Sequence, residues 1–134
     1  MSQDRSAQLR CLARGLTLGC GVCGRRRGLF RRGVVMVERC PRCNLTFERT
    51  EGHYIGAIGI NTILSFTALF FGLIVFVAAT YPDTPAGAWV FALLPVLALV
   101  PLLLYPVSKT LWTSIDLLMR PLEPGEALPE TEWR

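Results

Sequence analysis

Two long uncharged stretches constrain this chain more than any other feature. Residues 55–80 contain no charged side chain, and neither do residues 84–108. A hydrocarbon core of about 30 Å needs about 20 helical residues, so each stretch is long enough to cross a bilayer. The turn-rich segment 81–87, which includes the start of the second stretch, is the only connection between the apolar parts and predicts an antiparallel helical hairpin. The alternative, a hairpin buried in a soluble protein, would need covering elements for which little sequence remains.

The charged residues lie outside these stretches and are unevenly divided. Residues 1–53 hold eleven of the fourteen basic residues and four of the ten acidic ones, a net charge of +7, whereas the tail from residue 109 has a net charge of −2. Lys and Arg are enriched on the cytoplasmic flanks of membrane helices. The basic residues that flank the two stretches are Arg39, Arg42, Arg49, Lys109 and Arg120. We therefore expect both termini on the cytoplasmic side.

The first apolar stretch contains small and polar residues that suit helix packing. They are Gly56, Gly59, Asn61, Ser65 and Gly72. In lipid, small residues let backbones approach closely, and packing together with interhelical hydrogen bonds drives association. These residues can serve contact with the second helix of the same chain, with another membrane protein or with a second copy. Aromatic residues occupy the expected membrane interfaces: Tyr54, Tyr81, Trp89, Tyr105 and Trp112.

The second stretch predicts a bent helix that continues beyond the membrane. Prolines at positions 95, 101 and 106 each remove a backbone donor and favour a change of axis. The helical pattern then continues until Pro121, and Asp116 and Arg120 are spaced to pair on one face. The acidic, proline-containing segment that follows is expected to be frayed.

Four of the five cysteines form two C-x2-C pairs. Cys20 and Cys23 are followed, after sixteen residues, by Cys40 and Cys43. Two intervening residues let a tight turn point both sulfurs at one ion, and a spacing of about 15–20 residues between pairs is typical of a four-cysteine zinc ribbon. Gly and Asn tolerate left-handed backbone, and each pair is followed by one of them, at positions 24 and 44. Cys11 is expected to bind no metal.

Short β-prone segments surround the second cysteine pair. Residues 34–37 and 45–47 are suited to ribbon strands, with Leu29 and Phe30 in the opposing arm. So short a segment cannot build a self-sufficient core, and a metal ion would supply much of its folding free energy. The ligand set favours structural Zn²⁺ over iron, because the shell is not rich in aromatic residues. A cytoplasmic location argues against permanent disulfides, and redox or metal-handling chemistry is the alternative.

Seven arginines lie within or beside the cysteine region. They are Arg25, Arg26, Arg27, Arg31, Arg32, Arg39 and Arg42. Three partners suit such a cluster: anionic lipid headgroups of the bilayer, an acidic protein surface, or nucleic acid. Only Phe30 is interleaved with the arginines, so base stacking is poorly supported and nucleic acid is the least favoured partner.

Nothing in the sequence indicates catalysis. The lone histidine, His53, lies where the cysteine region meets the first apolar stretch, and no nucleophile can be assigned to the same site. A four-thiolate site leaves no open metal position for substrate or activated water. We therefore expect a protein that is not an enzyme.

Several short motifs occur in a fixed order along the chain. They are Cys20-x2-Cys23-Gly24, Gly28-Leu29-Phe30-Arg31, Cys40-Pro41-Arg42-Cys43, Leu45, Phe47-Glu48-Arg49-x-Glu51-Gly52, Gly56-Ala57 and Ile60-Asn61. In this order they resemble the bacterial membrane family known as domain of unknown function 983, over roughly residues 12–120 and most closely its actinobacterial members. Asn44 replaces the usual glycine, and the run of three arginines from position 25 replaces a less charged loop.

The resemblance implies a zinc-ribbon-like head on two helices in the bacterial inner membrane. Relatives are often encoded near cytochrome oxidase genes, which implies assembly of a respiratory complex.

The sequence thus predicts a membrane α-helical hairpin with a small four-cysteine β head. The expected segments are a basic N-terminal segment 1–17, a zinc-ribbon-like head 18–50, a first transmembrane helix 51–82, a second transmembrane helix with cytoplasmic extension 83–120, and an acidic tail 121–134. The function we infer is docking or assembly at a membrane-protein partner or in a homo-oligomer. Thiol redox or metal handling is the alternative, and tethered nucleic-acid binding ranks below both.

Overall fold

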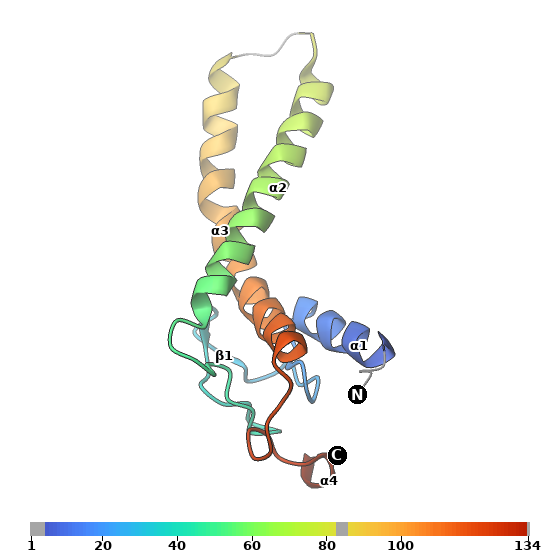
Figure 1. Ribbon diagram of the computed structural model, residues 1–134. Helices are drawn as coiled ribbons and strands as arrows, with labels where there is room; N and C mark the ends of the chain where they lie inside the picture. The colour runs from blue at the N-terminus through green and yellow to red at the C-terminus, as the bar shows by residue number, and fades with distance from the viewer. Residues whose placement is uncertain (1–4, 83–85, 134) are drawn as a thin grey trace.

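The computed structural model describes residues 5–82 and 86–133. Its elements are α1 (Arg5–Leu16), β1 (Phe30–Arg31), β2 (Val35–Met36), α2 (Tyr54–Thr80), α3 (Ala86–Met119) and α4 (Glu130–Trp133). The helices α2 and α3 project together from a head that contains the other elements, with α1 and α4 at the head end (Figure 1). Tyr54–Thr80 and Pro95–Met119 are each long and apolar enough to cross a membrane by length and composition. The turn residues 83–85 and the side chain of Trp89 lie outside the described part.

The helices α2 and α3 pack against each other near the head and separate toward their far ends (Figure 1). A Cβ added at Gly56 would overlap the ring of Trp112, so the absence of a side chain lets the indole lie against α2. The Ser108 hydroxyl donates a hydrogen bond to Asn61 Oδ1 at 3.3 Å. Gly59 and Gly72 differ, because no described atom lies within 4 Å of a Cβ added there. Of the expected packing residues, Gly56 and Asn61 therefore contact α3 of the same chain.

Alanine substitutions at Gly56 and at Gly59 should have opposite effects on the stability of the helix pair. Gly56→Ala forces Trp112 or the helix backbone to move, and overpacking of this kind costs about 1–3 kcal/mol. Gly59→Ala adds a methyl group in open space and gains up to about 1 kcal/mol of helix propensity. Thermal unfolding of the two variants in mild detergent measures the difference. Equal stability of the variants would contradict the Gly56–Trp112 contact.

Helix α3 is continuous through its three prolines, and its head-proximal part turns away from the line of the upper part (Figure 1). It ends at Met119, two residues before the proline predicted to stop it. The expected pairing of Asp116 with Arg120 is wrong. Asp116 is 5% exposed and pairs with Arg49 at 3.2 Å, because Arg49 reaches it from the head while Arg120 is exposed to solvent.

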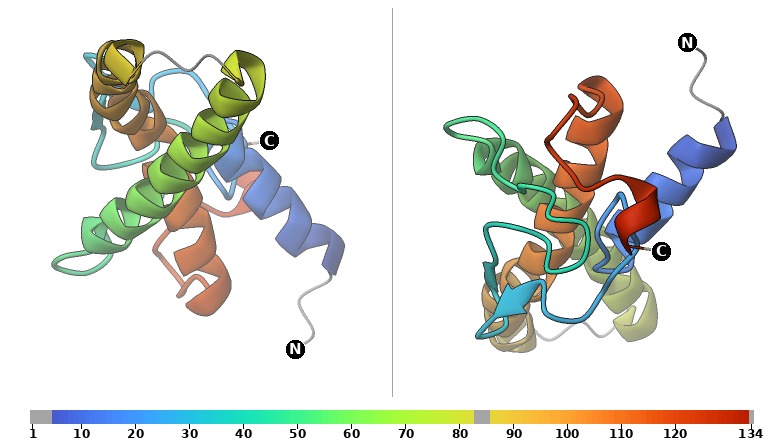
Figure 2. Two further views of the ribbon diagram at one scale, coloured as in Figure 1. Left: turned by 90° about the horizontal axis from the view of Figure 1, so that it is seen from above. Right: turned by 90° about the horizontal axis from the view of Figure 1, so that it is seen from below.

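The first helix, α1, was not anticipated from the sequence. It packs on the end of α3, and in the view from below α1 and the β strands lie on different sides of that helix (Figure 2). A Cβ added at Gly15 would overlap the Ser114 hydroxyl, and the Gly15 carbonyl accepts a 2.7 Å hydrogen bond from Thr110. Cys11 lies beside this contact, with its Sγ 3.7 Å from the carbonyl of Ser114. The small residue and the polar face of α3 fix α1 in place.

The head contains little regular structure. Strands β1 and β2 pair antiparallel, with Phe30 opposite Met36, and the N–H of Val37 bonds to the carbonyl of Leu29 at 2.9 Å. A single bridge joins Arg39 to Thr46. The expected segment 34–37 thus pairs with the arm that contains Leu29 and Phe30, whereas the segment 45–47 pairs with residues 38–40, and the strands themselves are only two residues long. Short pairing segments of this kind depend on something other than the sheet for stability.

The acidic segment after α3 is folded against the head, contrary to the expectation of a frayed tail. The N–H of Leu128 donates a 2.8 Å hydrogen bond to the carbonyl of Cys43. Glu126 forms an ion pair with Arg49 at 2.6 Å. Charge pairing with the head overrides the low local propensity of this segment for structure.

Candidate metal centre

The two C-x2-C pairs adopt the same local backbone. The N–H of Gly24 donates to the carbonyl of Cys20 at 2.8 Å, and the N–H of Asn44 donates to the carbonyl of Cys40 at 3.0 Å. Gly24 has φ +71° and Asn44 has φ +56°, the left-handed conformation that these two residue types tolerate. Each pair therefore forms a tight turn that points two sulfurs in one direction.

The four turn sulfurs meet at one point. All four ligand atoms, Sγ of Cys20, Cys23, Cys40 and Cys43, lie within 4.8 Å of one another. Across the two turns, Cys20 and Cys43 are 3.7 Å apart, and Cys23 and Cys40 are 3.6 Å apart. Four sulfurs at about 2.3 Å from a tetrahedral ion are about 3.8 Å apart, whereas a disulfide needs about 2.0 Å. The spacing fits a tetrahedral ion and not a disulfide.

The cluster forms the centre of the head's core. Its cysteines are between 0% and 7% exposed, and Leu29, Leu45 and Phe47 pack in the same buried cluster at 0–1%. Apart from the cysteines this core is small, so a cross-link through a metal would contribute much of its stability. The structure brings together all four predicted metal ligands, and Cys11 lies outside the group.

The charge of the cluster depends on a cation. Hydrogen bonds with Cys40 and Cys43 raise the pKa of Cys20, and hydrogen bonds with Cys20 and Cys43 lower the pKa of Cys40. One thiolate is stabilised by its protonated neighbours, and ionising all four at close range needs a positive ion among them. Binding a divalent cation therefore releases protons, and its apparent affinity falls as the pH falls.

The seven arginines singled out in the sequence surround this core without entering it. Arg25, Arg26, Arg27, Arg31, Arg32, Arg39 and Arg42 are all exposed. Two other arginines, Arg14 and Arg49, connect the head to the helices. Arg14 of α1 donates to the carbonyl of Val22 at 2.5 Å and to that of Gly21 at 3.3 Å, which ties α1 to the first cysteine turn.

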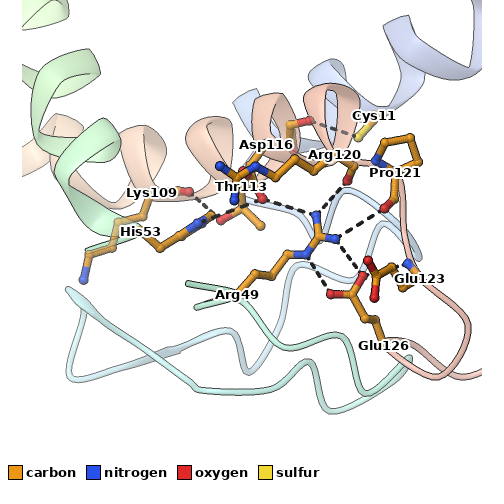
Figure 3. Close-up of polar contacts among 11 residues, drawn as sticks. Cys11, Arg49, His53, Lys109, Thr113, Asp116, Arg120, Pro121, Glu123 and Glu126 are labelled. Carbon is orange, nitrogen blue, oxygen red and sulfur yellow. Dashed lines mark hydrogen bonds and ion pairs between the residues drawn. The ribbon is translucent and has the colours of Figure 1, made fainter. Parts of the chain in front are cut away.

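Arg49 is the centre of a polar network that joins the head, the end of α3 and the tail (Figure 3). Its guanidinium contacts Glu126 through two nitrogens, at 3.0 and 2.6 Å, and Asp116 at 3.2 Å. It also donates to the carbonyls of Arg120 at 2.7 Å and Pro121 at 3.4 Å. From the sequence, Arg49 is only one of the basic residues that flank the apolar stretches, because its two carboxylate partners lie more than sixty residues away along the chain.

His53 belongs to the same network. Its side chain is 1% exposed, and its Nδ1 lies 4.0 Å from Asp116 Oδ2 (Figure 3). The centroid of its ring lies 6.2 Å from that of Trp112. Burial lowers the pKa of His53, with Asp116 acting in the opposite direction. A neutral, enclosed imidazole at this position connects the start of α2 to α3.

The comparison with protein families matches this arrangement. The profile described as a protein of unknown function, DUF983, covers residues 30–116, which include the second cysteine turn, α2 and most of α3. The chain belongs to the DUF983 family. The first cysteine turn and α1 lie before the matched residues, and the tail lies after them. No curated protein and no solved structure matches the chain. Membership in DUF983 agrees with the resemblance drawn from the motifs and assigns no activity.

Proposed function

We propose that this DUF983 protein is a membrane-anchored docking module, with a cytoplasmic head folded around a structural zinc ion and a hairpin that spans the bacterial inner membrane. The proposal rests on the observation that the four cysteines can fill all coordination positions of a tetrahedral ion. The chain supplies four buried sulfurs at tetrahedral spacing, so every ligand position is taken. Such a site stabilises a fold, and the function then belongs to the surface that the fold presents.

The surface of α2 supports a membrane location. None of the residues in its most apolar stretch is buried within the described part of the chain. Phe66, Phe70 and Phe71 are between 61% and 67% exposed. Aromatic side chains in such numbers on a water-exposed face would form an apolar patch much larger than monomeric soluble proteins carry. Lipid accounts for this exposure.

The contacts of Lys109 support a position for the membrane surface at the start of α2. Lys109 Nζ lies 4.7 Å from the ring centroids of both Tyr54 and Tyr105. The same amino group is 3.5 Å from the carbonyl of Val34 in the head. Tyrosine is enriched at membrane–water interfaces, and lysine is enriched on their cytoplasmic side. The head therefore lies close to the lipid, on the side that carries the basic residues.

Two surfaces support a membrane-protein partner. The exposed arginines of the head provide positive charge for acidic groups of a partner. Between α2 and α3 lies a hollow of about 200 Å³ lined by Asn61, Ser65 and Pro101 among others. The buried Ser65 hydroxyl has no hydrogen-bond partner among the described residues. Small and polar residues around such a hollow let a neighbouring helix approach closely.

The proposal is tested by purifying the tagged full-length chain from its native membrane in mild detergent and identifying co-purifying proteins by mass spectrometry. The diagnostic variant replaces Arg25, Arg26 and Arg27 by glutamate, and the matched control replaces the same three residues by lysine. We expect a membrane protein in stoichiometric amounts with the native chain and the lysine control, and its loss from the glutamate variant at unchanged zinc content. A partner that ignores the charge reversal, or reversible disulfide formation in the cluster, would refute the docking role.

A further inference from the structure

An apolar stripe on α1 is left uncovered by the described part of the chain. Leu9 is 66% exposed and Leu16 is 55% exposed, with the half-buried Leu12 between them. Their spacing of three and four residues puts all three on one side of the helix. The side that contacts α3 is a different one, which carries Cys11 and Gly15. The leucines are therefore not required for the fold of the head itself.

The direction in which the three leucines point follows from the contacts of Arg14. The Arg14 guanidinium reaches the carbonyls of the first cysteine turn, so the Arg14 side of α1 faces the head. At about 100° per residue, Leu9, Leu12 and Leu16 lie roughly 140–200° around the axis from Arg14. They consequently face away from the first cysteine turn. That turn lies on the side of α1 opposite to the one from which α2 and α3 project (Figure 1).

The level of α1 along α3 is also fixed. Gly15 contacts Thr110, and Cys11 contacts Ser114, so α1 crosses α3 just beyond Ser108, where its uncharged stretch ends. Thr110 and Ser114 lie two and six residues beyond Ser108, so the crossing point is about four residues, or about 6 Å of helix, from the end of the uncharged stretch. Amphipathic helices at membrane surfaces bury their apolar face by about 5–10 Å, which is a comparable distance. The helix runs sideways from the base of the hairpin instead of continuing along it (Figure 1). This is the position of a helix that lies on a bilayer surface.

The charges on α1 suit an anionic surface. Arg5 is one turn before Leu9 on the same side, and Arg10 is exposed on another side, while none of residues 5–16 is acidic. Long arginine side chains can extend from an apolar face to lipid phosphates. The exposed arginines of the head add to the same attraction.

We propose that α1 is an interfacial helix whose Leu9, Leu12 and Leu16 face enters the headgroup boundary of the cytoplasmic leaflet, with Arg5 at anionic phosphates. The inference rests on the proposed membrane hairpin. Through the Arg14 contact, α1 would connect the lipid surface to the first cysteine turn, and the head would be held at a fixed height and rotation beside the hairpin.

The test uses the full-length chain in vesicles of phosphatidylcholine containing one quarter phosphatidylglycerol. A Cys11→Ser background leaves four metal-bound cysteines, and single spin labels are introduced by Leu9→Cys, Leu16→Cys, Arg10→Cys or Phe70→Cys. Collision with oxygen, which concentrates in lipid, is compared with collision with a water-soluble nickel chelate. The zinc content of each variant verifies that the head is folded.

We expect labels at positions 9 and 16 to favour oxygen and the label at position 10 to favour nickel, with position 70 the most lipid-exposed. If position 70 favours oxygen while positions 9 and 10 are equally accessible to nickel, the interfacial helix is refuted and the hairpin stands. Protection of position 9 from both reagents means that protein covers the stripe, which also refutes the proposal. Nickel access at position 70 refutes the membrane hairpin itself.

Discussion

Replacing Cys43 by serine should abolish stoichiometric metal binding and unfold the head while α2 and α3 stay helical. Cys43 is fully buried, and its sulfur lies 3.7 Å from that of Cys20. Structural zinc supplies about 10–16 kcal/mol to small domains that bind it, which is more than the few buried residues of this head can replace. We expect metal analysis to show less than one ion per chain. Amide hydrogen exchange over residues 18–50 should rise to the level of an unfolded segment.

The matched control for this experiment is Cys11→Ser. Cys11 is half-buried outside the cluster, and serine keeps a donor for the carbonyl of Ser114. This variant should retain one ion per chain and native protection of the head. A Cys43→Ser chain that keeps its exchange protection without metal would show that the head folds independently of the ion.

Replacing Arg49 by glutamine should destabilise the junction between head and helices by about 3–5 kcal/mol, the range for removing one partner of a buried ion pair. The Arg49 and Asp116 side chains are only 9% and 7% exposed, so the substitution leaves the carboxylate buried and without its cation. The tail also loses its two-pronged contact with Glu126. Thermal unfolding in detergent and proteolysis of the segment after Pro121 measure the two effects.

The double variant Arg49→Gln with Asp116→Asn is the control for charge burial. It removes the unpaired carboxylate, so it should be more stable than Arg49→Gln alone. If the destabilisation of the double variant equals the sum of the destabilisations of the two single variants, the Arg49–Asp116 pair does not stabilise the junction as described.

Acid should weaken the same junction. The hydrogen bond from Arg49 lowers the pKa of Glu126. A carboxylate with a lowered pKa stabilises the fold above its unfolded value, and this stabilisation is lost as the pH falls through the folded value. In the native chain, the tail should therefore become more sensitive to proteolysis as the pH falls. In Arg49→Gln this pH dependence should be absent.

The features predicted correctly from sequence are those with local signals. The two C-x2-C pairs and the residues at positions 24 and 44 specify a turn geometry within five residues, and the structure has both turns. Uncharged runs specify long helices, and Pro121 follows the end of α3. Each of these features is encoded in one continuous segment of the chain and needs no contact with a distant residue.

The features missed depend on contacts between distant residues. Arg49 meets Asp116 and Glu126 across more than sixty residues, and neither spacing nor composition encodes that meeting. Local spacing favours the nearer Arg120 as the partner of Asp116. The sequence does not mark α1 as a packed helix, because its one buried residue is Gly15, which has no apolar side chain to indicate a packing face. Its fit depends on the shape of α3 and not on a periodic pattern.

X-ray absorption at the zinc edge of the purified full-length chain, combined with its metal content, tests the central claim most directly. A closed structural site predicts one zinc per chain with four sulfur neighbours at about 2.3 Å and no nitrogen or oxygen neighbour. A folded head without metal, or a bound ion with oxygen or nitrogen in its first shell, would contradict the account of this protein as a metal-folded head on a helical hairpin.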